Sequence, residues 1–204
     1  MNDAIQFLAA PFAMCLLLVG IHCYLGLHVL ARGVVFVDLS LAQVASLGAT
    51  LALLIDPEHS SHLGYFVSLG STLMAAALFA VARRYERHIS QEALIGITYA
   101  LASAAVVLVI DRLAHGAEHL KEALVGQILW VSWGDVARTF VIYAVVGVLH
   151  WIFRERFIGG SFGGAGNGAK AHWFWDFLFY ALFGVVITSS TSIAGVLLVF
   201  SFLI

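Results

Sequence analysis

The sequence predicts an all-α membrane protein, a polytopic transmembrane helical bundle with about six spans and a partial seventh. Three observations predict this class. Hydrophobic residues make up 62% of the 204 residues, and the mean hydropathy is +0.98. Charged residues make up only 11%, against about 25% in an ordinary soluble domain. These few charges fall in short clusters separated by about one membrane crossing, since a span needs about 20 apolar residues.

Six segments are long and apolar enough to cross a bilayer. Their approximate bounds are 7–31, 33–55, 63–82, 92–110, 136–153 and 173–190. A seventh apolar run, 193–204, is too short to cross, so we expect either a short final helix or, preferably, a truncated chain. The stretch 123–133 is apolar but only half a span long, which predicts a re-entrant or interfacial helix. We therefore expect residues 1–204 to form a single transmembrane domain.

Basic residues predict the orientation of the bundle. Seven fall on one side of the predicted spans: Arg32, Arg83, Arg84, Arg87, Arg154, Arg156 and Lys170. Three fall on the other side: Arg112, Lys121 and Arg138. Cytoplasmic loops carry an excess of Lys and Arg, so the first side is predicted to be cytoplasmic. The protein would then lie in the inner (plasma) membrane with its N-terminus outside.

The loops between the predicted spans exclude several classes of function. None is long enough to build a core of its own, so no soluble enzyme or nucleotide-binding domain is expected. The sequence contains no P-loop, no His-Glu-x-x-His and no Gly-x-Ser-x-Gly. If ATP powers transport, a separate chain must supply the ATPase. An intramembrane metal-dependent hydrolase that uses His115, Glu118 and His119 remains an alternative.

Histidine and carboxylate side chains gather in the two predicted outer loops. They are Asp56, Glu58, His59 and His62 in the first loop, and Asp111, His115, Glu118 and His119 in the second. If the fourth span continues as helix, Asp111, His115 and His119 recur every four residues on one face, with Glu118 beside them. Imidazole and carboxylate suit zinc, manganese or iron(II). The pattern predicts metal contact by these histidines and by Asp111 and Glu118; ordinary solvated loop groups are the alternative.

Asp38 is an acidic residue within the predicted second span. A charge at the bilayer centre costs at least about 2.5 kcal/mol, so Asp38 should face a cavity or a pathway. Gln43 and Ser46 would continue a polar stripe outward, and we predict a transport pathway along Asp38 and Gln43. His22 and His28 of the first span could face this stripe, although interhelical hydrogen bonds are the favoured interpretation for both.

Several segments resemble the permeases of zinc, manganese and iron(II) ABC importers. The segments are 32–38, 41–43, 47–48, 92–97, 124–135 and 195–199, in family order. The resemblance implies a permease subunit with alternating access, powered by a separate cytoplasmic ABC ATPase and supplied by an extracytoplasmic metal-binding receptor. It also implies a homodimer of permeases in the lipid bilayer, with no nucleic-acid partner. The divalent metal ion would be the transported substrate, with no permanently bound cofactor.

Three departures from the family pattern qualify what the resemblance implies. The family has His where Gln43 aligns, with its Asp four residues earlier, so the metal-handling role carries over better to Asp38. The family's ATPase-docking helix aligns with the glycine-rich segment 163–168, and only Ala169, Lys170 and Ala171 match it. Family members also continue beyond Ile204, so an inactive truncated permease is a further alternative. The sequence leaves the choice among the three metals open.

Overall fold

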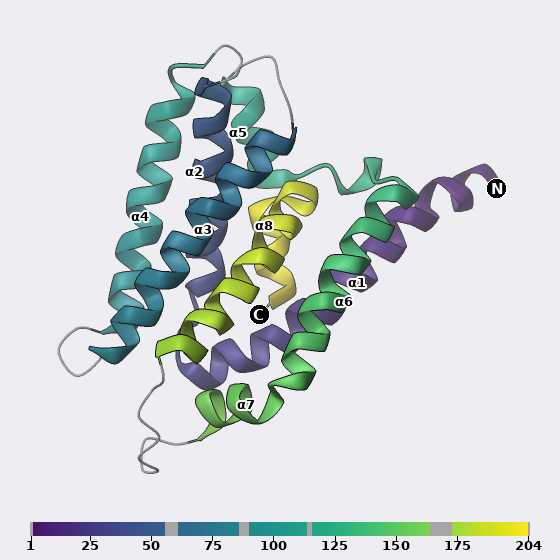
Figure 1. Ribbon diagram of the computed structural model, residues 1–204. Helices are drawn as coiled ribbons and strands as arrows, with labels where there is room; N and C mark the ends of the chain where they lie inside the picture. The colour runs from purple at the N-terminus through teal and green to yellow at the C-terminus, as the bar shows by residue number, and fades with distance from the viewer. Residues whose placement is uncertain (1, 56–60, 86–89, 114–115, 164–172, 204) are drawn as a thin grey trace.

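The computed structural model describes residues 2–55, 61–85, 90–113, 116–163 and 173–203, which form a bundle of helices (Figure 1). The long helices are α1 (Asn2–Arg32), α2 (Val37–Ile55), α3 (Ser61–Arg84), α4 (Gln91–Ile110), α6 (Trp133–Ile152) and α8 (Trp173–Leu203). The short ones are α5 (Gly116–Val125), the 3₁₀ helix η1 (Ile128–Trp130) and α7 (Arg154–Phe162). No strand occurs in these ranges. The predicted all-α class is confirmed.

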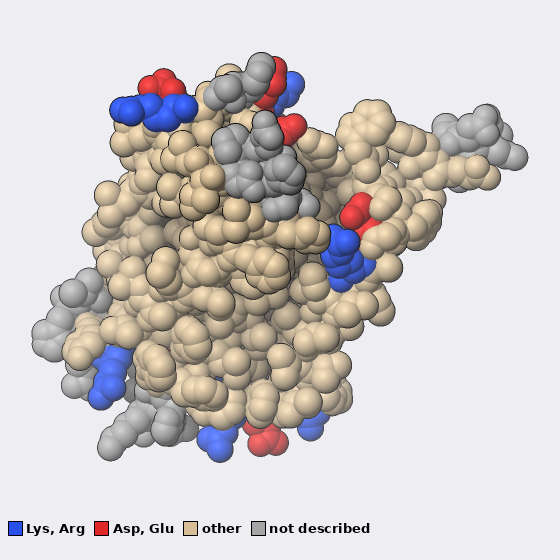
Figure 2. Space-filling model, turned by 45° about the horizontal axis from the view of Figure 1, so that its top comes forward, with Lys and Arg blue, Asp and Glu red and all other residues tan. Residues whose placement is uncertain are grey.

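Six of these helices are long and apolar enough to cross a membrane. They are the six that the hydropathy pattern predicts, with ends that differ by only a few residues except at the end of α8. Large apolar side chains, such as Phe12, Leu101 and Phe140, are exposed on the outside of the bundle. Figure 2 shows charged side chains gathered mainly toward two ends of the molecule, with a broad band of other residues between them. This distribution is typical of a protein surrounded by lipid.

The centre of the bundle is built from α2, α3 and α8, which pack closely on one another. Small residues make this approach possible. A Cβ at Gly48 of α2 would come within 2.7 Å of the Cα of Ser68 in α3, and Gly184 of α8 lies against Thr72. Around this centre, α1 buries a stripe with helical spacing against its neighbours: Met14, Leu18, His22, Leu25 and Val29.

The helix α8 contains a sharp turn at Gly195, where φ is 73° and ψ is 165°. After this turn the chain doubles back toward the C-terminal part of α1, where Leu203 lies against Gly26 (Figure 1). The run 193–204 therefore contains a separate short helix, which begins after Gly195 and extends to Leu203. This agrees with the short final helix, or partial seventh span, that the sequence predicts.

The connection between α4 and α6 consists of short helical pieces separated by breaks. The helix α4 ends at Ile110 with Asp111 as its C-cap, and α5 begins at Gly116. The backbone of Gly116 packs so closely on Ile110 that a Cβ would overlap the Ile110 carbonyl oxygen. The condition for one continuous helical face through the second loop is therefore not met. The half-span 123–133 is wrong as a single helix, because α5 ends at Val125 and a turn and a 3₁₀ helix follow.

The helix directions place the described basic residues as the sequence predicts. Arg32, Arg83, Arg84, Arg154 and Arg156 lie at one end of the bundle, called the basic end below. Arg112, Lys121 and Arg138 lie toward the opposite end. Arg87 and Lys170 fall outside the described residues.

Candidate functional site

A buried group of three charged residues joins three long helices at the basic end. The Oδ1 atom of Asp176, at the start of α8, accepts hydrogen bonds from Arg32 of α1 and from Arg83 of α3, each at 2.9 Å. The side chains of Arg32, Asp176 and Arg83 are 1%, 7% and 18% exposed. A buried charge is stable only when it is paired and hydrogen-bonded. This ion-pair triad satisfies that requirement with one carboxylate between two guanidinium groups.

The same two arginines hold the short helix α7. The Nε atom of Arg32 donates to the hydroxyl of Ser161 at 2.9 Å, and Nη2 of Arg83 donates to the carbonyl of Gly160 at 2.6 Å. His28 forms a further hydrogen bond to the Ser161 hydroxyl, at 2.9 Å. The triad therefore ties α7 to the ends of α1, α3 and α8.

The bond between His28 and Ser161 confirms the interhelical hydrogen bond expected for His28. The expectation is wrong for His22, whose Nδ1 pairs with the Leu18 carbonyl in its own helix. The Nε2 atom of His22 is buried and finds no hydrogen-bond partner in the part of the chain that the structure describes. Both imidazoles thus serve the packing of α1 rather than a shared polar stripe.

Asp38 lies in the first turn of α2, at the basic end, and is only 1% exposed. Neither of its carboxylate oxygens makes a hydrogen bond within the described part of the chain. Its neighbours include the amide of Leu39 and the carboxylate of Glu92, at the start of α4. Glu92 accepts a bond from the amide of Phe36 at 3.3 Å, while its Oε2 is buried and has no hydrogen-bond partner among the described residues. Two carboxylates with unpaired oxygens thus meet where α2 and α4 pack together.

Gln43 is also buried, at 8% exposure, but it does not continue a stripe from Asp38. Both belong to the continuous helix α2, so five residues of separation rotate Gln43 about 140° away from Asp38. The buried polar residues that do share a face with Gln43 are Ser40 and Thr50. The predicted stripe through Asp38 is therefore wrong, and residue spacing alone could have found the correct one.

Hydroxyl groups link the central helices away from the ends. Thr72 of α3 bonds to Thr188 of α8 at 3.0 Å, and Tyr143 of α6 bonds to Ser190 of α8 at 2.7 Å. Neither pair is among the contacts predicted from the sequence. Hydroxyls within apolar spans were the available signal, because they commonly hydrogen-bond across helices in membranes.

The structure separates the outer residues that were predicted to bind metal. Asp111 is an exposed C-cap residue, Glu118 is exposed and His119 is half-buried on α5, and His62 is exposed in the first turn of α3. His59 and His115 lie outside the described residues. Within the part of the chain that is described, no three His, Cys, Asp or Glu side chains are grouped to hold a metal ion. The face that was expected to align Asp111 with His119 is interrupted by the break between α4 and α5.

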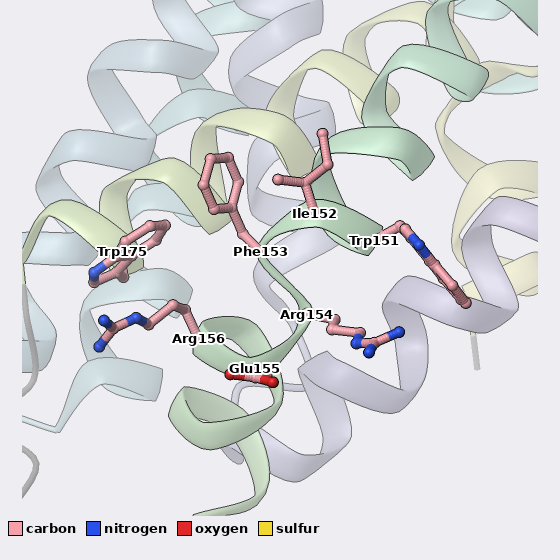
Figure 3. A pocket seen from close by; sticks show the side chains of 7 residues that line it. All are labelled: Trp151, Ile152, Phe153, Arg154, Glu155, Arg156 and Trp175. Carbon is pink, nitrogen blue, oxygen red and sulfur yellow. The ribbon is translucent and has the colours of Figure 1, made fainter.

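An open groove of about 660 Å³ lies at the corner between α6 and α7. Figure 3 shows the side chains that line it: Trp151, Ile152, Phe153, Arg154, Glu155, Arg156 and Trp175. Arg154 lies over the ring of Trp151 and Arg156 over that of Trp175, at 5.0 and 5.7 Å. The groove is thus a charged and aromatic surface at the basic end. The predicted ATPase-coupling residues, Ala169, Lys170 and Ala171, lie outside the described residues.

Six membrane-length helices around buried carboxylates, arginines and hydroxyls define an integral membrane protein of the transporter class. The chain belongs to the ABC 3 transport family, whose model matches residues 4–204. This membership confirms the resemblance to ABC importer permeases at the family level. It makes the chain a membrane-embedded transport subunit rather than an enzyme, which removes the support for the hydrolase alternative.

The chain is also similar to a solved structure, "PsaBC from Streptococcus pneumoniae in complex with Fab". The two share 21% sequence identity with a TM-score of 0.76, and the match covers 100% of this chain and 73% of that chain. At this identity the likeness establishes a common fold. No protein of curated function matched the sequence.

Proposed function

We propose that the protein is the permease subunit of an importer for a divalent transition-metal ion: zinc, manganese or iron(II). Asp38 carries this proposal, as a buried carboxylate whose two oxygens make no hydrogen bond in the described chain. A buried carboxylate is costly unless a cation or a proton accompanies it. Glu92 supplies a second carboxylate nearby, and carboxylate oxygens are ligands of divalent metals. A metal cation that passes the basic end of the bundle would bind the carboxylates of Asp38 and Glu92.

Alternating access around this path requires a separate source of energy. We propose that the basic end faces the cytoplasm, where a separate ABC ATPase binds near α7 and the segment that follows it. An extracytoplasmic receptor would deliver the metal ion at the opposite end, where His62, Asp111, Glu118 and His119 lie and to which the sequence assigns His59 and His115. A second copy of the permease would complete the transporter. The excess of basic residues at one end supports this orientation.

Substitution of Asp38 tests the pathway. Asp38→Asn keeps the shape of the side chain but removes its charge. In vesicles that contain the permease and its ATPase, uptake of radiolabelled zinc or manganese should fall about 100-fold, equivalent to about 2.7 kcal/mol. The amount of folded protein should stay near that of the wild type, because a neutral amide is easier to bury than a carboxylate.

Two further variants make this test specific. Glu92→Gln should also reduce uptake, whereas Glu122→Gln should not, because Glu122 is an exposed carboxylate in α5, away from both Asp38 and α7. Gln43→Ala should have a smaller effect than Asp38→Asn, because Gln43 faces away from Asp38. Wild-type uptake by Asp38→Asn would refute the proposed path.

Labelling of single cysteines tests the orientation. Cys15 and Cys23 are free thiols and are first replaced by alanine. A cysteine in place of His62 should then react with a membrane-impermeant thiol reagent in intact cells. A cysteine in place of Lys170 should react only after the cells are opened. The reverse pattern of labelling would show that the bundle has the opposite orientation in the membrane.

A further inference from the structure

The helix α7 cannot be stable by itself. It has nine residues, and no side chain caps its N-terminus. Isolated helices shorter than about 12 residues are marginal in water. Its position must therefore come from contacts with the rest of the bundle. One of these is apolar: Phe157 is fully buried and its ring packs against the rings of His150, Trp175 and Phe179.

Within the described chain, the hydrogen bonds that tie α7 to α1 and α3 all lie in its last turn. The carbonyl of Gly160 accepts from Arg83, and the hydroxyl of Ser161 accepts from Arg32. These two positions directly precede the segment 164–172, which leads into α8. The arginines therefore fix α7 at the end from which the chain leaves it.

Asp176 fixes both arginines at the same time. Its Oδ1 atom receives one guanidinium from α1 and one from α3, and the Arg32 guanidinium also lies 3.9 Å from the centre of the Phe179 ring. Arg side chains are long, but each of these two is held at more than one point. A displacement of the C-terminal part of α7 must therefore pull on α1, α3 and α8 together.

We propose that Arg32, Arg83 and Asp176 are positioning residues that couple α7 to the membrane helices, so that movement imposed on α7 by the ATPase reaches the transport path. Arg32 stands at the end of α1, five residues before α2 begins, and Asp38 lies in the first turn of α2. The triad thus connects α7 to the chain segment that carries the buried carboxylate. This inference rests on the proposed function, because it assumes an ATPase bound at the basic end.

The most informative variant is Arg83→Gln/Asp176→Asn. It removes one positive and one negative charge, so the buried group keeps its native net charge and leaves a single guanidinium to bury. It abolishes both ion pairs and replaces the guanidinium that binds the Gly160 carbonyl. Ser161→Ala is a milder second variant, which removes only the hydroxyl that Arg32 and His28 share. Arg84→Gln is the matched control, because Arg84 is the exposed neighbour of Arg83 in α3.

The first measurement is amide hydrogen exchange of the purified permease. In the double variant, the amides of residues 159–163 should exchange at least about tenfold faster, as expected when local opening becomes easier. The amides in the middle of α3 and α8 should keep their protection. Ser161→Ala should show a smaller change in the same residues, and Arg84→Gln none. Unchanged exchange at residues 159–163 in the double variant would overturn the inference.

The second measurement is the number of ATP molecules hydrolysed per metal ion transported by the complete transporter. A residue with only a structural role would lower the amount of active protein and leave this ratio unchanged. The double variant should raise the ratio about tenfold, equivalent to a loss of about 1.4 kcal/mol in the transport step, while basal ATP hydrolysis stays within about twofold. A wild-type ratio would overturn the coupling role. Failure of the wild-type complex to transport metal would instead refute the proposed function, and the exchange measurement would still test the attachment of α7.

Discussion

The two ends of the bundle are held together by different kinds of contact. At the basic end, three charged side chains from α1, α3 and α8 meet and bind α7. At the opposite end, two glycine backbones meet directly. Gly126 and Gly195 both have positive φ, 69° and 73°, and Gln127 donates its amide proton to the Ile193 carbonyl at 2.9 Å.

The two kinds of contact differ in how far the helices that they join can shift without breaking them. Arginine side chains are long and flexible, so an ion-pair network can follow a shift of a helix and still remain bonded. A backbone contact between glycines has no side chain to adjust, and it fixes the α8 turn against the chain that follows α5. We therefore expect the basic end to transmit movement and the opposite end to depend on close packing.

The largest effect on stability is expected for Asp176→Asn. This change leaves two guanidinium groups together in a buried site without their carboxylate. Breaking a buried ion pair by removing one partner costs about 3–5 kcal/mol. Thermal unfolding in detergent should show this loss, and adding Arg83→Gln should recover part of it. If the single and double variants were equally stable, repulsion between the arginines would not be the cause.

Gly195→Ala should destabilise the opposite end by a comparable or smaller amount. A residue with a Cβ in this backbone conformation, which is essentially restricted to glycine, costs about 1–3 kcal/mol, and the overlap of the Cβ with the backbone of Gly126 adds about 1–3 kcal/mol. Gly147→Ala is the matched control, since Gly147 lies in α6 with no atom near its would-be Cβ. The control should be neutral or stabilising by up to about 1 kcal/mol. Equal melting temperatures for the two variants would show that the contact between Gly126 and Gly195 can accommodate an added Cβ.

The two ends also differ in how well their structure could be predicted. The six spans follow from hydropathy, because length and apolar composition decide which helices can cross a membrane. The triad does not, since it pairs residues that are up to 144 positions apart in the chain. Arg32 and Arg83 were interpreted only as charges that orient the bundle. Asp176 was the available signal, because an acidic residue within a predicted span requires a partner.

At the opposite end, the helical face considered for Asp111 and His119 is interrupted for a local reason. The spacing of Asp111 and His119 suited one helical face only if α4 continued. Gly116 instead allows the chain to fold tightly against Ile110, and a new helix begins there. A glycine within a helical pattern is a known signal of such a break, but its close contact with Ile110 cannot be seen in the sequence. For Asp38, the predicted place on a transport pathway stays a prediction, whereas its rotation relative to Gln43 follows from helical spacing.

The smallest effect is expected between the two ends, at the bond from Tyr143 to Ser190. The Ser190 hydroxyl donates to the Val186 carbonyl at 2.6 Å, so the Tyr143 hydroxyl is the donor in their 2.7 Å contact. In Tyr143→Phe, Ser190 keeps its own acceptor and no buried donor is left unpaired. Hydrogen bonds between membrane helices contribute about 0.6 kcal/mol on average, and Tyr143→Phe should cost about this amount in detergent unfolding.

The control for this prediction is Ser190→Ala, alone and combined with Tyr143→Phe. Ser190→Ala should cost more than Tyr143→Phe, because it leaves the buried Tyr143 hydroxyl without its acceptor, at about 1–3 kcal/mol. In the double variant that penalty should disappear, since neither polar group remains. If Tyr143→Phe alone cost more than about 2 kcal/mol, beyond the largest value measured for such bonds, the contact between α6 and α8 would be as rigid as the glycine contact. The contrast between charged, backbone and hydroxyl contacts would then no longer explain where the bundle can move.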